Sequence, residues 1–240
     1  YYVAVDPSRR GEGVGAVIMD AAEAWLRRAG APKSQLMVRD DNATARGFYL
    51  HRGYEPSEVT VLGRWLGADD AASGESRRPT PERALSVRLA SDDDTATLAD
   101  LRFNGRVVER GQVGLDRDAY AELMAAWTHR HRATHRAFLV EEFGVARGVA
   151  WLALLERVPS PESPRRRSGM LQNVYLAPEH RNRGLGAALV AGVVEHAWAE
   201  GLDYLMVHHS PRSGDFYRRL GFVPPDAELE LRLGPGPARG

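Results

Sequence analysis

The feature that most constrains this chain is a strand, a glycine-rich loop and a helix that follow one another between residues 171 and 197. Residues 171–176 are mostly apolar and predict a buried strand, and from residue 185 apolar residues recur at helical spacing. The N–H groups that open such a helix carry the positive end of its dipole. Gly184 and Gly186 remove the Cβ atoms that would hold a bulky anion away. The segment therefore predicts a site for a phosphate or diphosphate.

Taken alone, this pattern would equally suit a tightly packed strand-to-helix turn, but it occurs twice in the chain. Residues 2–16 repeat an apolar strand, a proline, an arginine and a Gly-x-Gly that opens an apolar helix. Both predicted helices end at a glycine and are followed by a strand. The motif Phe-Tyr-x-x-x-Gly-aromatic comes next, at 48–54 and 216–222. Two segments that share this whole order indicate a duplicated domain.

The two motifs resemble those of the GNAT superfamily of acyl-CoA-dependent N-acyltransferases: Arg-x-x-Gly-x-Gly after a strand that a proline ends, then Phe-Tyr-x-x-x-Gly-Phe. The resemblance implies an α/β (α+β) fold with two GNAT-type mixed sheets flanked by helices, the first represented only by its C-terminal half. We expect residues 1–66 to form this half and 67–82, which are rich in Gly, Ser, Pro and charge, to be a linker. We expect 83–234 to be the complete GNAT domain and 235–240 a tail.

Two other interpretations of the glycine loop are excluded. Gly11-x-Gly13-x-x-Ala16 also fits a dinucleotide-binding fingerprint. In the second copy, however, Leu189 takes the place of the small third residue, and the next strand ends in histidines rather than an acid. A nucleoside-triphosphate loop is excluded because the chain has no Gly-Lys-Ser or Gly-Lys-Thr.

Composition limits the partners. Lys and Arg together number 32, the same as Asp and Glu, so no net charge favours nucleic acid or an anionic membrane. The absence of cysteine excludes disulfides, thiolate metal sites and a cysteine nucleophile. The sequence shows no signal peptide or membrane-spanning stretch. We expect a cytoplasmic protein without nucleic-acid or membrane partners.

The first copy begins on the strand before its glycine loop, so it lacks the counterpart of residues 83–172. Such a half sheet would leave an unpaired strand edge, which is a liability in solution. We expect either that the natural chain continues upstream of Tyr1 or that a second chain, as in a homodimer, supplies the missing strands.

The resemblance implies that an acetyl group moves from acetyl-CoA to an amine of a small molecule or peptide N-terminus by direct attack in a ternary complex. The pantetheine arm would lie where the strand at 171–176 separates from that at 204–208, with the Val174 N–H on the thioester carbonyl. Tyr217 stands at the family's position for the acid that protonates the leaving thiolate. The residues expected to bind coenzyme A in the complete domain are Val174, Leu176, Arg181, Asn182, Arg183, Gly184, Leu185, Gly186, Ala187, Ser210 and Tyr217.

The first copy matches these positions with two differences. Glu12 stands in place of Arg183 and brings a negative charge, which Arg9 partly offsets, and Ser210 of the second copy replaces Asn42. We therefore expect the second domain to be the main catalyst and the first to be structural or weakly binding. The corresponding residues of the first copy are Val3, Val5, Arg10, Gly11, Gly13, Gly15, Asn42 and Tyr49.

The general base stays open, and so does a non-catalytic acyl-CoA-binding or scaffold role. Met170 stands roughly where some protein-acetylating members of the family have a glutamate. The polar residues that could act as the base, directly or through water, are Glu156, His208, Gln172 and Asn173.

Two basic segments have a functional and a plain interpretation. His131 and His135 have the spacing of a metal pair on one helix, but without a third ligand we expect a solvated helix end and no metal. The arginines of a polar loop expected at 159–168 could meet the coenzyme's 3′-phosphate, although a solvated loop is favoured.

Overall fold

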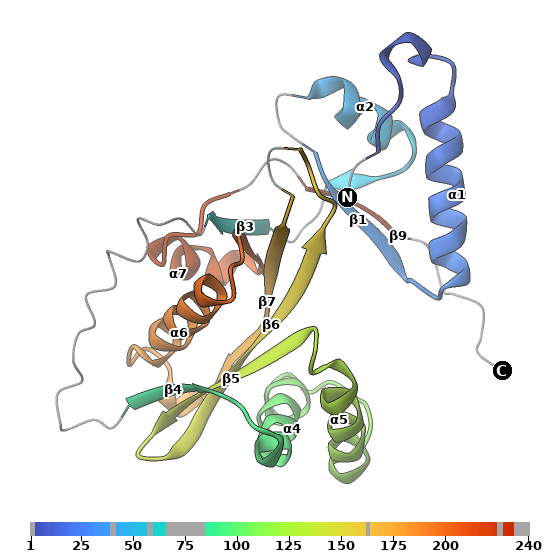
Figure 1. Ribbon diagram of the computed structural model, residues 1–240. Coiled ribbons are helices and arrows are strands. Elements are labelled where there is room, and N and C mark those ends of the chain that lie inside the picture. Colours follow the sequence, from blue (N-terminus) through green and yellow to red (C-terminus); the bar gives the residue numbers. More distant parts are fainter. Residues whose placement is uncertain are drawn as a thin grey trace. The chain divides into compact units, whose positions relative to one another are not determined.

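The computed structural model divides the chain into two compact units (Figure 1). Unit 1 comprises Tyr1–Val61 and Pro224–Gly240, and unit 2 comprises Leu62–Val223. None of the helices in the described ranges is long and apolar enough to cross a membrane. The expected linker and tail lie outside these ranges. The structure describes residues 3–38, 42–56, 60–65, 85–161, 164–224 and 228–232.

Unit 2 is built on a six-stranded sheet in the order β3-β8-β7-β6-β5-β4. The pairs β4–β5, β5–β6 and β6–β7 are antiparallel, and β7–β8 is parallel. The sheet is therefore mixed, which confirms the expected fold class of the complete domain. The strands are β3 (Thr60–Trp65), β4 (Leu85–Leu89), β5 (His135–Glu142), β6 (Val145–Arg157), β7 (Arg166–Leu176) and β8 (Tyr204–His209).

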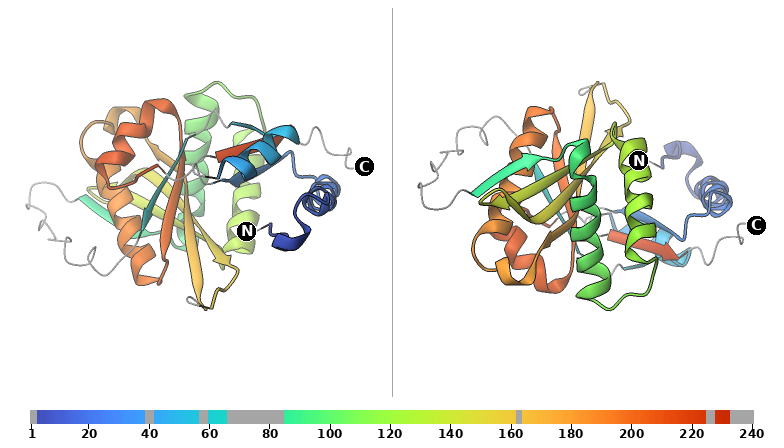
Figure 2. Two further views of the ribbon diagram at one scale, coloured as in Figure 1. Left: turned by 90° about the horizontal axis from the view of Figure 1, so that it is seen from above. Right: turned by 90° about the horizontal axis from the view of Figure 1, so that it is seen from below.

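Helices cover both faces of this sheet (Figures 1 and 2). On one face α6 (Leu185–Ala199) and α7 (Gly214–Arg219) pack on a cluster that includes Val140 and Leu152. On the other face α4 (Thr95–Phe103), its π-helical continuation η3 (Asn104–Val108) and α5 (Arg117–His131) pack on a cluster that includes Leu139 and Trp151. The alternation of apolar side chains along β5 and β6 thus supplies both cores, and each fully buried side chain contributes about 1.5–3 kcal/mol.

Unit 1 repeats the second half of unit 2 in element order. Its α1 has 15 residues, as α6 has, and glycines with similar positive φ follow both helices, Gly30 at 76° and Gly201 at 72°. The elements of unit 1 are η1 (Pro7–Arg9), α1 (Val14–Arg28), β1 (Lys33–Met37), α2 (Ala43–His51), β2 (Glu55–Pro56) and β9 (Glu228–Arg232).

The two copies of the repeat exchange their last strands, so the compact units differ from the domain limits expected from the repeat. Strand β3, expected in the first copy, joins β8 in the sheet of unit 2, and Gly63 exchanges two backbone hydrogen bonds of 2.8 Å with Val223. Strand β9, expected in the second copy, pairs with β1 and β2. Gly63 is required here because an added Cβ would overlap the ring of Tyr204. The repeat locates the copies but not the sheet that each final strand joins.

Two loops also differ from the sequence expectation. The strands expected at 137–143 and 148–158 are β5 and β6, and only Phe143 and Gly144 join them, both at positive φ (54° and 74°). Strand β7 begins at Arg166, inside the polar loop expected at 159–168.

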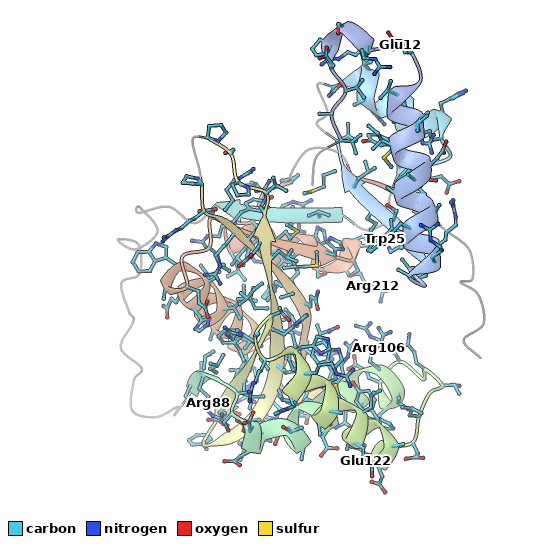
Figure 3. All side chains as sticks on the ribbon, turned by 45° about the vertical axis from the view of Figure 1, so that its right-hand side comes forward. Glu12, Trp25, Arg88, Arg106, Glu122 and Arg212 are labelled. Atoms are coloured by element: carbon cyan, nitrogen blue, oxygen red, sulfur yellow. The ribbon has the colours of Figure 1, made fainter. Side chains whose placement is uncertain are left out.

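Helix α1 is far more exposed than α6. Met19 and Glu23 are its buried residues, whereas seven residues of α6 are buried. Val17 is 69% and Trp25 62% exposed, and Figure 3 shows Trp25 on the side of α1. The described part of unit 1 contains no counterpart of β5 and β6, on which α6 packs, and α1 has fewer buried residues accordingly.

An ion-pair cluster joins β4, the turn before α4, and β5. Arg88 of β4 (labelled in Figure 3) donates two hydrogen bonds to the Asp94 carboxylate, at 2.7 and 2.8 Å, and lies 2.7 Å from Glu141 of β5. Asp94 also accepts a hydrogen bond from the Ser91 N–H and so caps the turn before α4. The hydrogen bonds from Arg88 hold the pKa of Asp94 well below its usual range.

Gly148→Ala should destabilise unit 2 by about 1–3 kcal/mol, because the added Cβ would lie 2.5 Å from the backbone oxygen of Tyr175. Gly114→Ala, where an added Cβ meets nothing within 4 Å, should change stability by less than about 0.5 kcal/mol. Chemical denaturation of both variants measures the difference. Equal stabilities would contradict the close packing of β6 against β7.

Asp94→Asn should lower the free energy of unfolding near neutral pH by about 1–2 kcal/mol, through the loss of charged hydrogen bonds. Since the folded-state pKa lies below that of the unfolded state, the unfolded state binds more protons as the pH falls below about 4, and this stabilisation is lost there. The free energy of unfolding, measured by denaturation at several pH values from 7 to 3, should fall more steeply with pH for the wild type than for Asp94→Asn. Parallel pH profiles would show that Arg88 does not hold this carboxylate.

Candidate functional site

Strands β7 and β8 separate at the point where the site was expected. Their parallel pairing covers only Ser168–Leu171 and Tyr204–Val207. Both strands continue, β7 to Leu176 and β8 to His209, and no further pair between them is found in the described chain. The second half of β7 therefore presents backbone N–H and C=O groups on its β8 side.

A bulge in β7 lies at this opening. Tyr175 pairs with Val149 of β6, and Gln172 pairs with Trp151, so Asn173 and the residue after it have no partner in the register with β6. Asn173 has a φ of 51°, in the left-handed region that asparagine tolerates. Arg102 of α4 donates a hydrogen bond to its side-chain oxygen. The Val174 N–H, expected to hold the thioester carbonyl, thus belongs to a residue outside the β6 register.

The loop between β7 and α6 leaves backbone N–H groups free. The short helix η4 (Pro178–His180) follows β7, and the first hydrogen bond of α6 runs from the Ala188 N–H to the Gly184 C=O at 3.0 Å. The N–H groups of residues 185–187 therefore have no acceptor within the helix. Asn182 and Gly184 take positive φ values of 58° and 87°.

The two glycines of this loop have different roles. Gly184 is needed for its φ, since an added Cβ would meet nothing within 4 Å. An added Cβ on Gly186 would lie 3.2 Å from Leu176 and 3.5 Å from the Phe216 ring, so this glycine allows α6 to approach the sheet and α7. An added Cβ would therefore enter open space at Gly184 and meet neighbouring side chains at Gly186.

Arg181 and Arg183, expected to bind coenzyme A, are both paired with carboxylates. Arg181 lies 2.6 Å from Glu109, at the end of η3, and donates to the C=O of Leu176 at 2.9 and 3.1 Å. This pairing lowers the pKa of Glu109. Arg183 donates to Glu142 of β5 at 2.6 Å. Each arginine therefore fastens the loop to another element, and its charge is largely neutralised.

Tyr217 lies in the core between α7 and the sheet. It is 6% exposed, and its ring contacts those of Phe216 (5.0 Å between centroids) and Phe222 (5.8 Å). Burial raises the pKa of Tyr217 to about 12. The phenol therefore carries its proton throughout the physiological range and can donate it in a hydrogen bond.

His209, which the sequence did not single out, lies beside this tyrosine at the end of β8. It is 5% exposed, and its Nδ1 donates to the C=O of Ser210 at 2.7 Å. Its Nε2 is buried and has no hydrogen-bond partner in the described part of the chain. Ser210 itself is exposed, with its hydroxyl 3.3 Å from that of Ser213.

The strand register places the candidate bases at different distances from the opening between β7 and β8. Glu156 lies opposite Arg167, five residues along β6 from Trp151, which is about 16 Å at the rise of a strand. Gln172 begins the open part of β7, and His208 follows the last paired residue of β8. Of these candidates, Gln172, Asn173 and His208 lie beside the opening, and the side-chain oxygen of Asn173 already accepts a hydrogen bond from Arg102.

The glycine loop of the first copy has the same backbone shape. Gly11 and Gly13, with φ values of 88° and 81°, match Asn182 and Gly184. An added Cβ on Gly15 would lie 3.5 Å from Phe48 and 3.6 Å from Val5, the contacts of Gly186 repeated. The loop therefore forms without the strands that accompany it in unit 2.

The surroundings of that loop differ from unit 2. Val3 and Val5, expected on a strand, lie outside the regular strands of unit 1. Glu12 pairs with Arg9 at 2.9 Å, within the loop itself, and Arg10 is exposed (Figure 3 shows Glu12 on this loop).

The aromatic residues of the first copy make the same ring contacts as those of the second. Tyr49 contacts Phe48 at 5.1 Å and Tyr54 at 5.4 Å, and burial raises its pKa. Asn42 caps α2 by accepting the Ala45 N–H at 3.0 Å, so its side-chain oxygen is already occupied.

The histidine pair does not lie on one helix. His131 ends α5 and His135 begins β5, and both rings pack on Trp127, at 4.5 and 4.8 Å. They are half-buried rather than solvated, and burial lowers the pKa of His135. Among the described residues no group of three or more His, Asp or Glu side chains is placed to hold a metal.

Comparison with known proteins agrees with this geometry. The structure is similar to that of a predicted acetyltransferase from Clostridium acetobutylicum solved with acetyl-CoA. The TM-score is 0.51 at 18% identity, over 59% of this chain and 92% of that chain. It is also similar to a tandem GNAT protein from the clavulanic acid biosynthesis pathway. Here the TM-score is 0.60 at 16% identity, over 97% of this chain and 74% of that chain.

At these identities the two likenesses show the fold alone. The model of the acetyltransferase (GNAT) family matches residues 1–54 and 86–222 of the sequence, and these two segments are the two copies of the repeat. Because the match covers well over half of the chain, this chain belongs to the acetyltransferase (GNAT) family.

Proposed function

We propose that this chain is an N-acetyltransferase that moves an acetyl group from acetyl-CoA to the amine of a small molecule or a peptide N-terminus, by direct attack in a ternary complex. Family membership supports acetyl transfer in general. The observation that carries the proposal is the separation of β7 from β8 after Leu171 and Val207, which leaves the far half of β7 unpaired on that side.

The described residues fit acetyl-CoA as co-substrate. The free N–H groups of residues 185–187, at the positive end of α6, would take the diphosphate. The backbone of Val174 and Leu176 would bind the pantetheine arm like an added strand. The Val174 N–H would donate to the thioester oxygen as negative charge develops there, a type of contact worth about 10²–10³ in rate.

In the reaction the amine nitrogen attacks the thioester carbon, the C–S bond breaks, and the thiolate leaves with the electron pair. Burial raises the pKa of Tyr217 to about 12, above the value of about 8.5 for a thiol, so the hydroxyl keeps its proton until negative charge develops on the sulfur. Tyr217 therefore acts by donating a hydrogen bond to the departing sulfur. The proton that the amine releases passes to a base or to water, and Gln172 and His208 are the side chains beside the opening that could relay it.

The proposal places the working site in unit 2. Its loop follows a strand held in a sheet, whereas Val3 and Val5 of the first copy lie outside the regular strands, and Glu12 brings a negative charge next to the expected diphosphate. The first copy is accordingly structural or a weak coenzyme site.

Tyr217→Phe should lower turnover about 10- to 100-fold and leave the affinity for acetyl-CoA nearly unchanged, because the hydroxyl acts on the leaving sulfur only in the transition state. Release of free thiol from acetyl-CoA, followed with a panel of small amines and short peptides, measures turnover. Tyr49→Phe tests the first copy: a loss in this variant instead would move the catalytic centre to unit 1. Acetyl-CoA binding without turnover in the wild type would favour the non-catalytic alternative.

A further inference from the structure

We propose that Glu142, the last residue of β5 before the β5–β6 turn, is a positioning residue for the coenzyme loop, acting through Arg183 and His180. The inference rests on the proposed coenzyme site in unit 2. Arg183 contributes to diphosphate binding by fixing the loop whose N–H groups bind the diphosphate, rather than through its own charge.

The contacts of Glu142 form a closed cluster. Glu142 is 5% exposed, and its carboxylate accepts a hydrogen bond from Arg183 Nη2 at 2.6 Å. Its second oxygen lies 3.4 Å from His180 Nδ1, and Arg183 Nη1 lies 3.1 Å from the same nitrogen. Because Arg183 precedes Gly184 directly and His180 ends η4, the cluster holds the loop on both sides of Asn182.

A backbone hydrogen bond also attaches the loop to the β5–β6 hairpin. The register of β5 and β6 shifts between Val140 and Glu141, which leaves Arg147 without a partner on β5. The C=O of Arg147 accepts the Ala177 N–H at 3.0 Å, just after β7 ends. The loop is thus tied to the hairpin by a backbone hydrogen bond at its start and by the carboxylate of Glu142 near its end.

Stability alone does not account for this ion pair, in which the Glu142 side chain is buried and the Arg183 side chain is 36% exposed. The cost of desolvating the carboxylate offsets much of the attraction, and well-packed apolar residues often serve stability equally well. What an ion pair adds is a defined geometry, since each charged group is satisfied in one arrangement only. That geometry fixes the backbone next to Asn182 and Gly184, whose left-handed conformations set the direction of the following N–H groups.

The first copy supplies the contrast. There the position of Arg183 is taken by Glu12, which pairs with Arg9 three residues away, and both side chains are more than half exposed. Such local, exposed pairs contribute about 0–1 kcal/mol. In unit 2 the loop is therefore held by a carboxylate of the distant strand β5, whereas in unit 1 the only pair of this kind among the described residues lies within the loop itself.

Glu142→Gln separates the two roles of Arg183 by the sign of its effect. If Arg183 acted through its charge, removing the paired carboxylate would free that charge, take away a nearby negative group and tighten acetyl-CoA binding. If Glu142 positions the loop, the same change should weaken binding about 10- to 100-fold, because the N–H groups lose their fixed direction.

The experiment is a calorimetric titration of the full chain with acetyl-CoA and with 3′-dephospho-CoA. We expect Glu142→Gln to weaken both by the same factor, since both ligands carry the diphosphate. Asp94→Asn breaks an ion pair of unit 2 away from the loop, and it should leave both affinities within about twofold although it lowers stability.

If Glu142→Gln unfolds, a double variant tests the same positioning role. In Glu142→Leu/Arg183→Met the apolar pair should restore thermal stability toward that of the wild type without restoring acetyl-CoA affinity. Unchanged or tighter binding in Glu142→Gln, or full affinity in the double variant, would overturn the positioning role. Failure of the wild type to bind acetyl-CoA would instead overturn the proposed function.

Discussion

Four residue pairs join β7 to β8, and the candidate site depends on where that pairing ends. The parallel ladder stops at Leu171 and Val207 while both strands continue, so a row of backbone groups on β7 is left open inside an otherwise complete sheet. The bulge at Asn173 lies in that open part and takes Val174 out of the register with β6. A sheet that paired to its end would have no place for an extended ligand.

The electrostatics of the site differ from a simple basic pocket. Both motif arginines are paired, Arg181 with Glu109 and Arg183 with Glu142. The positive potential left for a diphosphate comes chiefly from the N–H groups that open α6, whose direction is set by the left-handed residues before them. Fixed backbone donors need no reorganisation when a ligand binds, whereas a flexible side chain must be ordered first.

Much of this could be predicted from the sequence because the signals are local. The glycine pattern predicted the loop and helix α6, and the repeat predicted the matching loop at Gly11 and Gly13, whose backbone angles agree with those of unit 2. Glu109 and Glu142 could not be found in this way, since they lie 72 and 41 residues from the arginines they hold. The exchange of β3 and β9 between the sheets was missed for a similar reason. A strand's own pattern does not say which of two equivalent edges it joins.

The most direct test of the account is amide hydrogen exchange of the full chain with and without acetyl-CoA. If the open half of β7 and the start of α6 form the working site, residues 174–188 should gain protection on addition of acetyl-CoA, and residues 3–17 should change little. Protection confined to residues 3–17 would place the coenzyme in the first copy. An unchanged pattern in both segments would contradict a coenzyme site at either loop.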